Sequence, residues 1–152
     1  MDKKAGNALK RARNSKGITQ ERLAEMSGYS VDSIQAWESG LRNPSNSALD
    51  LLGEVLEAKW LTAVFLREQS EGGSLQEAIP EFTPGEPLPQ AVLSLLEKVY
   101  KFVDKHSDRR LMTIAADGKI TEEERPEFDD VMEDLNGITR AAMALRYAKT
   151  AE

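Results

Sequence analysis

The 152-residue sequence contains no cysteine and only one histidine, His106. Without thiols the chain has neither a disulfide framework nor a thiolate metal site, which suits a reducing compartment. A catalytic pairing of a cysteine nucleophile with histidine is excluded, and no glycine-rich phosphate loop is present. We therefore expect a protein that is not an enzyme and that holds no cofactor and no metal.

Long apolar runs are also missing. No stretch approaches the roughly 20 apolar residues that a membrane-spanning helix needs. The N-terminus is charged and lacks the apolar segment of a signal peptide. These absences predict a cytoplasmic protein that does not associate with a membrane.

Basic residues are fewer than acidic ones, 20 against 26, which gives a formal net charge of −6. The charge is unevenly distributed. Residues 1–46 contain eight Lys/Arg and five Asp/Glu, a net of +3, whereas residues 47–152 contain twelve and twenty-one, a net of −9. This asymmetry indicates that the N-terminal part is the region that contacts a polyanion such as DNA.

Two short helices joined by a glycine turn are predicted between Gly17 and Gly40. Thr19 and Ser30 are residues that commonly cap helix N-termini, and each precedes a run of good helix formers. Gly28 supplies the left-handed residue that ends the first of these helices. The arrangement predicts a helix-turn-helix, which places its second helix in the major groove of DNA.

The region from Ala5 to Gln69 resembles the Cro/repressor family of phage and bacterial transcriptional regulators, the xenobiotic-response-element type. The matching residues are Arg13, Gly17, Thr19, Gln20, Leu23, Ala24, Gly28, Ser30, Ile34, Trp37, Glu38, Gly40 and Pro44. The resemblance implies an all-α, five-helix DNA-binding domain that binds double-stranded DNA in a sequence-specific manner.

The resemblance also implies roles for single residues. Arg13 and Glu38 correspond to a structural ion pair, and Gln20 corresponds to a residue that contacts a DNA phosphate. The outward face of the second helix carries Ser30, Val31, Asp32, Ser33, Gln35 and Ala36, among which Val31, Asp32 and Ala36 occupy the usual base-reading positions. Three further basic residues are expected to contact phosphates: Lys10, Lys16 and Arg42.

This reading face departs from the family pattern. Val31 and Ala36 offer only a methyl contact to thymine, and Gln35 is the one amide on the face. Asp32 has two interpretations, as an acceptor for a cytosine amino group or as an acidic residue that suits the helix N-terminus. We therefore expect modest direct readout, with operator shape contributing to specificity.

The chain organisation is predicted from composition and periodicity. Four of the six prolines lie in residues 70–90, together with three glycines. We expect a DNA-binding domain over 1–69, a Pro/Gly-rich linker over 70–87, and a helical oligomerisation or regulatory domain over 88–152.

The C-terminal domain shows two apolar stripes spaced three and four residues apart. The first comprises Leu88, Val92, Leu95, Val99, Phe102 and His106. The second comprises Phe128, Val131, Leu135, Ile138, Ala142 and Leu145. We expect oligomer contacts through Leu95, Val99, Phe102, Leu135, Ile138 and Leu145, the alternative being a self-contained three-helix domain without a partner.

The segment Thr113–Glu124 partly mimics a calcium loop. Its first and third positions are Thr113 and Ala115, where oxygen-rich acidic ligands are required. Thr121 and Glu124 have instead the spacing of a capping box. We therefore expect a helix start and no calcium site.

Together these features predict a transcriptional repressor that binds a palindromic operator as a dimer or higher oligomer. The alternative is an interaction protein or an antitoxin, in which the C-terminal bundle binds a partner protein. The operator sequence and the choice between dimer and tetramer do not follow from the sequence.

Overall fold

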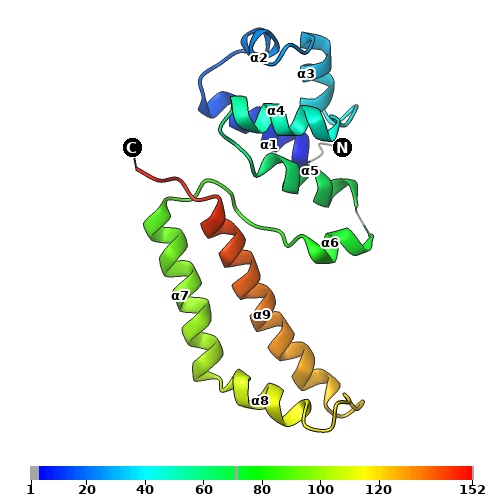
Figure 1. The fold of residues 1–152 in the computed structure, drawn as a ribbon, viewed down its shortest axis with the longest axis vertical. Helices are drawn as coiled ribbons and strands as arrows, with labels where there is room; N and C mark the ends of the chain where they lie inside the picture. The colour runs from blue at the N-terminus through cyan, green and yellow to red at the C-terminus, as the bar shows by residue number, and fades with distance from the viewer. Residues whose placement is uncertain (1–3, 71, 152) are drawn as a thin grey trace. The chain divides into compact units, whose positions relative to one another are not determined.

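A computed structural model describes residues 4–70 and 72–151. Within these residues the regular structure is helical, with one isolated bridge between Pro87 and Lys149. The predicted all-α class is therefore confirmed. The chain divides into two compact units, one ending at Glu81 and one beginning at Phe82 (Figure 1).

Six helices of the described chain belong to the N-terminal unit. They are α1 (Lys4–Ser15), α2 (Gln20–Ser27), α3 (Val31–Glu38), α4 (Asn46–Val55), α5 (Leu61–Gln69) and α6 (Ser74–Ala78). The first five correspond to the expected five-helix domain. The short α6 lies within residues 70–87, where we expected a linker, and the boundary between the units also falls inside that range.

The core of the N-terminal unit consists of large side chains from α1 to α5 that are essentially inaccessible to solvent: Leu9, Leu23, Ile34, Leu49, Leu52, Leu61 and Phe65. Complete burial of each such side chain stabilises the fold by about 1.5–3 kcal/mol. Gly6 lets α1 approach the end of α3, because an added Cβ would lie 2.5 Å from the Glu38 carbonyl oxygen and 2.7 Å from that of Trp37. The core thus fixes the position of α3.

The C-terminal unit contains α7 (Leu88–Asp104), α8 (Ser107–Ile114) and α9 (Arg125–Arg146). The two long helices pack lengthwise as a hairpin, which α8 connects (Figure 1). Its open end is closed by Phe82, whose ring stacks on Tyr147 with 5.5 Å between centroids. The Lys149 N–H also donates to the Glu86 carbonyl at 2.7 Å. Residues at the end of the expected linker are therefore packed within this unit.

The turn between α8 and α9 contains the expected capping box. The Thr121 N–H donates to Glu124 Oε2 at 2.9 Å, and the Glu124 N–H donates to Thr121 Oγ1 at 3.3 Å. Pro126 lies in the first turn of α9, where its missing N–H costs no intrahelical bond. In the described part of the chain, no group of three or more acidic, histidine or cysteine side chains is arranged to hold a metal ion.

The predicted apolar stripes of the C-terminal unit are only partly covered within the unit. On the first, Leu88 and Val92 are each 37% exposed, and His106 lies beyond the end of α7 with a φ of 54°. On the second, Ala142 is exposed while the neighbouring Ala141 is buried. The reason is that α9 covers only one side of α7, and a helix of 3.6 residues per turn drifts away from a seam drawn with a period of 3.5.

Over the described residues, the structure has no helix that is both long and apolar enough to cross a bilayer.

Candidate nucleic-acid interface

The expected helix caps define the boundaries of α2 and α3. Thr19 Oγ1 accepts a hydrogen bond from the Arg22 N–H at 3.1 Å, and Ser30 Oγ accepts one from the Ser33 N–H at 3.1 Å. Gly28 has a φ of 74° between them, and its N–H donates to the Ala24 carbonyl. Local sequence therefore sets where each helix of the pair begins and ends.

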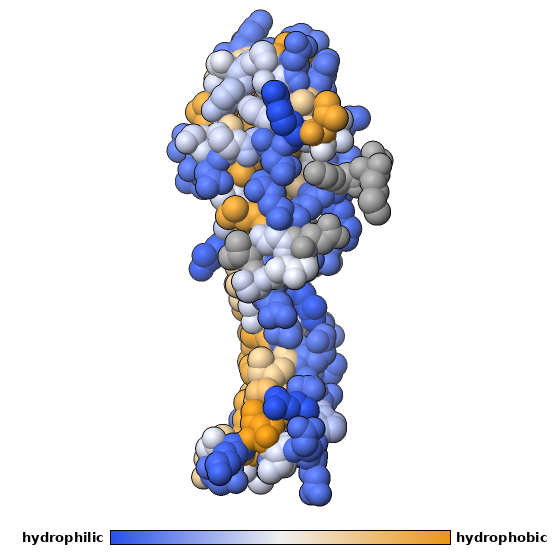
Figure 2. Space-filling model, turned by 90° about the vertical axis from the view of Figure 1, so that its right-hand side faces the viewer, coloured by the Kyte–Doolittle hydropathy of each residue, from blue (hydrophilic) through white to orange (hydrophobic). Residues whose placement is uncertain are grey.

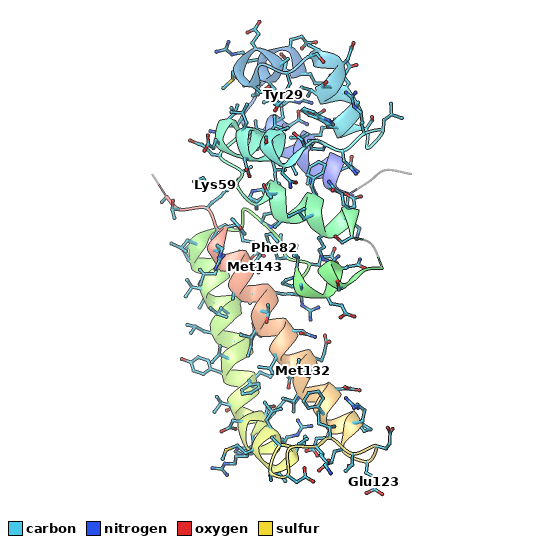
Figure 3. The ribbon with its side chains drawn as sticks, turned by 45° about the vertical axis from the view of Figure 1, so that its right-hand side comes forward. Tyr29, Lys59, Phe82, Glu123, Met132 and Met143 are labelled. Carbon is cyan, nitrogen blue, oxygen red and sulfur yellow. The ribbon has the colours of Figure 1, made fainter. Side chains whose placement is uncertain are left out.

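The turn between these helices is anchored by an aromatic contact. The Tyr29 ring meets the buried Trp37 ring edge to face, with 5.1 Å between centroids (Tyr29 is labelled in Figure 3). Such aromatic pairs add about 0.5–1.5 kcal/mol beyond the area that they bury. The contact ties the turn to the buried side of α3.

A buried ionic network joins α1 to the end of α3. Arg13 Nε donates to Glu38 Oε1 at 2.6 Å, and a second Arg13 nitrogen donates to Glu38 Oε2 at 3.1 Å. Arg13 is 8% exposed and Glu38 is 6% exposed. The hydrogen bond to Glu38 raises the pKa of Arg13 above its ordinary value, so the guanidinium stays charged.

Gln20 belongs to the same network. Its Nε2 donates to Glu38 Oε2 at 2.8 Å, and its side chain is half-buried at the start of α2. One amide hydrogen of this residue, which we expected to contact a phosphate, is therefore used inside the protein. The bond to Glu38 orients the rest of the amide at the helix N-terminus, where backbone N–H groups favour anions.

Fewer side chains on the outward face of α3 are exposed than its sequence suggests. Asp32 and Gln35 are exposed, and so is Ser30 at the helix cap. Val31 is half-buried and packs against the core, and Ala36 is half-buried. The side chains with the most freedom to contact a base edge are therefore Asp32 and Gln35.

A chain of hydroxyl groups places an arginine beside this face. An Arg42 guanidinium nitrogen donates to Ser33 Oγ at 3.1 Å, and Ser33 Oγ lies 3.0 Å from Ser30 Oγ. The backbone N–H of Arg42 also donates to the Ala36 carbonyl at 3.2 Å. Arg42 follows the end of α3 in sequence, but these contacts bring its charge back along the helix.

Leu41 is the residue of this loop that sequence reasoning missed. It is 85% exposed and directly precedes Arg42. The signal in the sequence was a lone leucine in a turn, outside the apolar stripe of any helix. Its position makes it a candidate for apolar contact with DNA.

The other basic residues differ in their surroundings. Lys10 is exposed on α1. The Lys16 ammonium forms an ion pair with Glu57, which follows α4. A partnered lysine has less charge available for a phosphate, so Lys10 and Arg42 are the stronger phosphate-binding candidates.

The comparisons with known proteins support this assignment. Residues 9–59 match the helix-turn-helix family. No curated protein and no solved structure matches the chain. The match confirms the expected Cro/repressor-type helix-turn-helix and spans α2, α3 and α4 completely. It identifies double-stranded DNA as the ligand of the N-terminal unit.

Proposed function

We propose that this DNA-binding transcriptional regulator, whose residues 9–59 form a Cro/repressor-type helix-turn-helix domain, is a repressor. It binds a palindromic operator as a dimer or higher oligomer and blocks access of the polymerase. The observation that carries the proposal is the position of α3, which buries Trp37 and Glu38 and leaves Asp32 and Gln35 exposed. Because its ligand is DNA, we place the protein in the cytoplasm.

Direct readout is assigned to two exposed residues of α3. The Gln35 amide can form a bidentate contact with adenine, and the Asp32 carboxylate can accept from a cytosine amino group. Each good bidentate contact discriminates against a wrong base by about 1–3 kcal/mol. With so few readers, sequence-dependent DNA shape supplies part of the specificity.

Affinity is assigned to phosphate contacts around the same helix. Arg42 and Lys10 carry positive charge that would neutralise phosphates and release counterions. The outward part of the Gln20 amide would bind a phosphate at the N-terminus of α2. The observed affinity should therefore fall steeply as the salt concentration rises.

The experiment is selection of operator DNA from a randomised pool, followed by footprinting on the DNA upstream of the protein's own gene. We expect a palindromic site that is protected in a salt-sensitive manner. Gln35→Ala should change the preferred bases, whereas Lys10→Ala should weaken binding to all sequences alike. Gln69→Ala provides the matched control, because this glutamine is exposed at the end of α5.

Two results would refute the proposal. One is the absence of salt-sensitive protection at micromolar protein. The other is a selected pool without sequence preference. If the wild type selected a palindromic site and Gln35→Ala selected the same bases, the assignment of Gln35 as a base reader would be wrong, while the repressor function would stand.

A second candidate function is that of an interaction protein or antitoxin whose C-terminal unit binds a partner protein. The exposed apolar side chains of α7, such as Leu93 at 68% exposure, favour it. A purified full-length chain that remains monomeric and binds no specific DNA would support this function over the first.

A further inference from the structure

Helix α7 carries an apolar stripe that no described part of the chain covers. Leu93, Leu96, Tyr100 and Val103 recur at spacings of three and four, as at the a and d positions of a heptad. They are 68%, 40%, 62% and 54% exposed. Three of them, Leu93, Leu96 and Tyr100, line a shallow groove along the helix together with the charged residues beside them, and Figure 2 shows apolar surface extending along this unit. We call these four residues the α7 stripe.

The C-terminal unit has little core of its own. Its buried apolar residues are Ala91, Ile114, Val131, Ala141 and Ala144. Only two of these are larger than alanine, whereas the N-terminal unit buries eight leucine, isoleucine or phenylalanine side chains to an exposure of 3% or less. A helix hairpin with so few buried large side chains needs a further layer packed against it to be stable.

We propose that the missing layer is a second copy of this chain, which packs its own α7 stripe against the first in a two-fold dimer. The inference rests on the proposed function, in which two DNA-binding units act together, and it specifies the surface that joins them.

The charges around the stripe suit a second copy. Glu97, Asp104, Lys101 and Lys105 border the groove, so that its rim carries both signs. The Lys105 ammonium is already paired with Asp130 and Asp134 of α9, which leaves Lys101 as the rim lysine that can pair with an acid of the second copy. A two-fold pair presents acids and lysines from both copies along one seam. A strongly charged surface, such as DNA or an anionic membrane, has no complementary charge here.

The available area also suits such a dimer. With Leu88 and Val92 included, the exposed apolar surface is roughly 500 Å² per copy, or about 1,000 Å² for the pair, against about 1,200 Å² at the lower end of specific interfaces. The charged rim supplies the remainder. A four-helix arrangement would follow, with each α7 between its own α9 and the other copy.

This surface differs from the one expected from the sequence. Leu95, Val99 and Phe102 are half-buried on α7, and Leu135, Ile138 and Leu145 are half-buried on α9, the helix that packs against it. Those six residues stabilise the hairpin in our proposal, and the α7 stripe joins the copies.

The test is the mass of the full-length chain in solution without DNA, measured by light scattering between about 1 and 100 µM. We expect twice the chain mass of 16.9 kDa for the wild type. Leu96→Glu should weaken the dimer at least about 100-fold, because it places a charge in each half of an apolar seam. Met112→Glu is the matched control, since Met112 is 75% exposed on α8 outside the stripe and should leave the mass unchanged.

A milder variant covers the case in which Leu96→Glu fails to fold, as judged by circular dichroism. Leu96→Ala should keep its helix content and dissociate at least about tenfold more readily. The wild-type melting temperature of the C-terminal unit should also rise with protein concentration.

The inference is overturned by a wild-type monomer at 100 µM, or by a dimer that both Leu96 variants leave unchanged. A monomer that still protects an operator would refute the interface and keep the repressor function. A dimer that is sensitive to Leu96 and protects no DNA would support the interface and refute the repressor function.

Discussion

Substitution of Glu38 by glutamine tests the buried network that seats the recognition helix α3. The wild-type carboxylate accepts two hydrogen bonds from Arg13, the shorter at 2.6 Å, and one from Gln20 at 2.8 Å. Glutamine keeps the size of the side chain but removes its charge. The Arg13 guanidinium then stays buried without a carboxylate partner. Its hydrogen bond to the Ile18 carbonyl at 2.9 Å is unchanged.

The expected loss of stability follows from the burial of Arg13. Breaking a buried ion pair by removal of one partner costs about 3–5 kcal/mol, because an uncompensated charge remains. Since the Ile18 carbonyl still accepts from Arg13, we expect the lower end, about 3 kcal/mol. For a unit of this size each kcal/mol shifts the melting temperature by about 4–8 °C, so the expected decrease is about 12–24 °C.

The tryptophans make the assay specific for one unit. The chain contains two tryptophans, Trp37 and Trp60, and both lie in the N-terminal unit. Thermal and urea unfolding followed by tryptophan fluorescence therefore reports this unit. Far-ultraviolet circular dichroism reports both units and should retain the C-terminal contribution.

Two further variants test whether the loss of stability comes from an unpaired buried charge. Glu25→Gln breaks the Arg22–Glu25 pair, whose side chains are 60% and 68% exposed, and should cost less than about 1 kcal/mol. Replacing Arg13 by methionine and Glu38 by leucine together should recover most of the loss, because no charge is left unpaired. A Glu38→Gln variant that loses no more stability than Glu25→Gln, or a double variant that is less stable than Glu38→Gln alone, would refute this role of the buried network.

The other predictions concern single sites. Gly6→Ala should destabilise the N-terminal unit by about 1–3 kcal/mol, because the added methyl group meets the backbone of α3. Gly137→Ala, where the nearest atom is a Lys98 carbon at 3.7 Å, should instead stabilise α9 by about 0.5–1 kcal/mol. If both variants shifted the melting temperature in the same direction, the close approach of α1 to α3 at Gly6 would be contradicted. Hydrogen bonds from Arg110 and then Lys105 lower the pKa of Asp130, so its contribution to stability is present above about pH 3.9, the ordinary aspartate pKa, and is lost as the pH falls through the lower folded value. The helix content of an Asp130→Asn variant should therefore depend less on pH between 2 and 5. Asp32→Asn should raise affinity for non-operator DNA at low salt, since it removes a negative charge that faces phosphate, and unchanged affinity in a gel shift would refute this role.

The two units differ in how far their sequences predict them. In the N-terminal unit, Thr19, Ser30 and Ser45 each cap the helix that follows, as their residue types predict. In the C-terminal unit, the stripe that includes Val99 and Phe102 was correctly placed on a helix. Its last residue, His106, lies beyond the end of α7. Apolar residues occur on more than one side of α7, and periodicity alone does not say which side α9 covers.

The candidate site shows the same division. The type and spacing of its residues predicted a helix-turn-helix, and the family match to residues 9–59 confirms it. The partners of individual side chains were not predictable. The bond from Gln20 to Glu38 spans 18 residues, and the bond from Arg42 to Ser33 runs back along the helix from the loop that follows it.

Local sequence specifies where α2 and α3 begin and end and that this pair forms a DNA-reading motif, because caps, glycine turns and apolar spacing act over a few residues. The tertiary structure alone decided which polar groups of that motif are already engaged and which stripe of α7 stays exposed. These outcomes depend on which helix faces approach each other, and such contacts join residues that are distant in the chain.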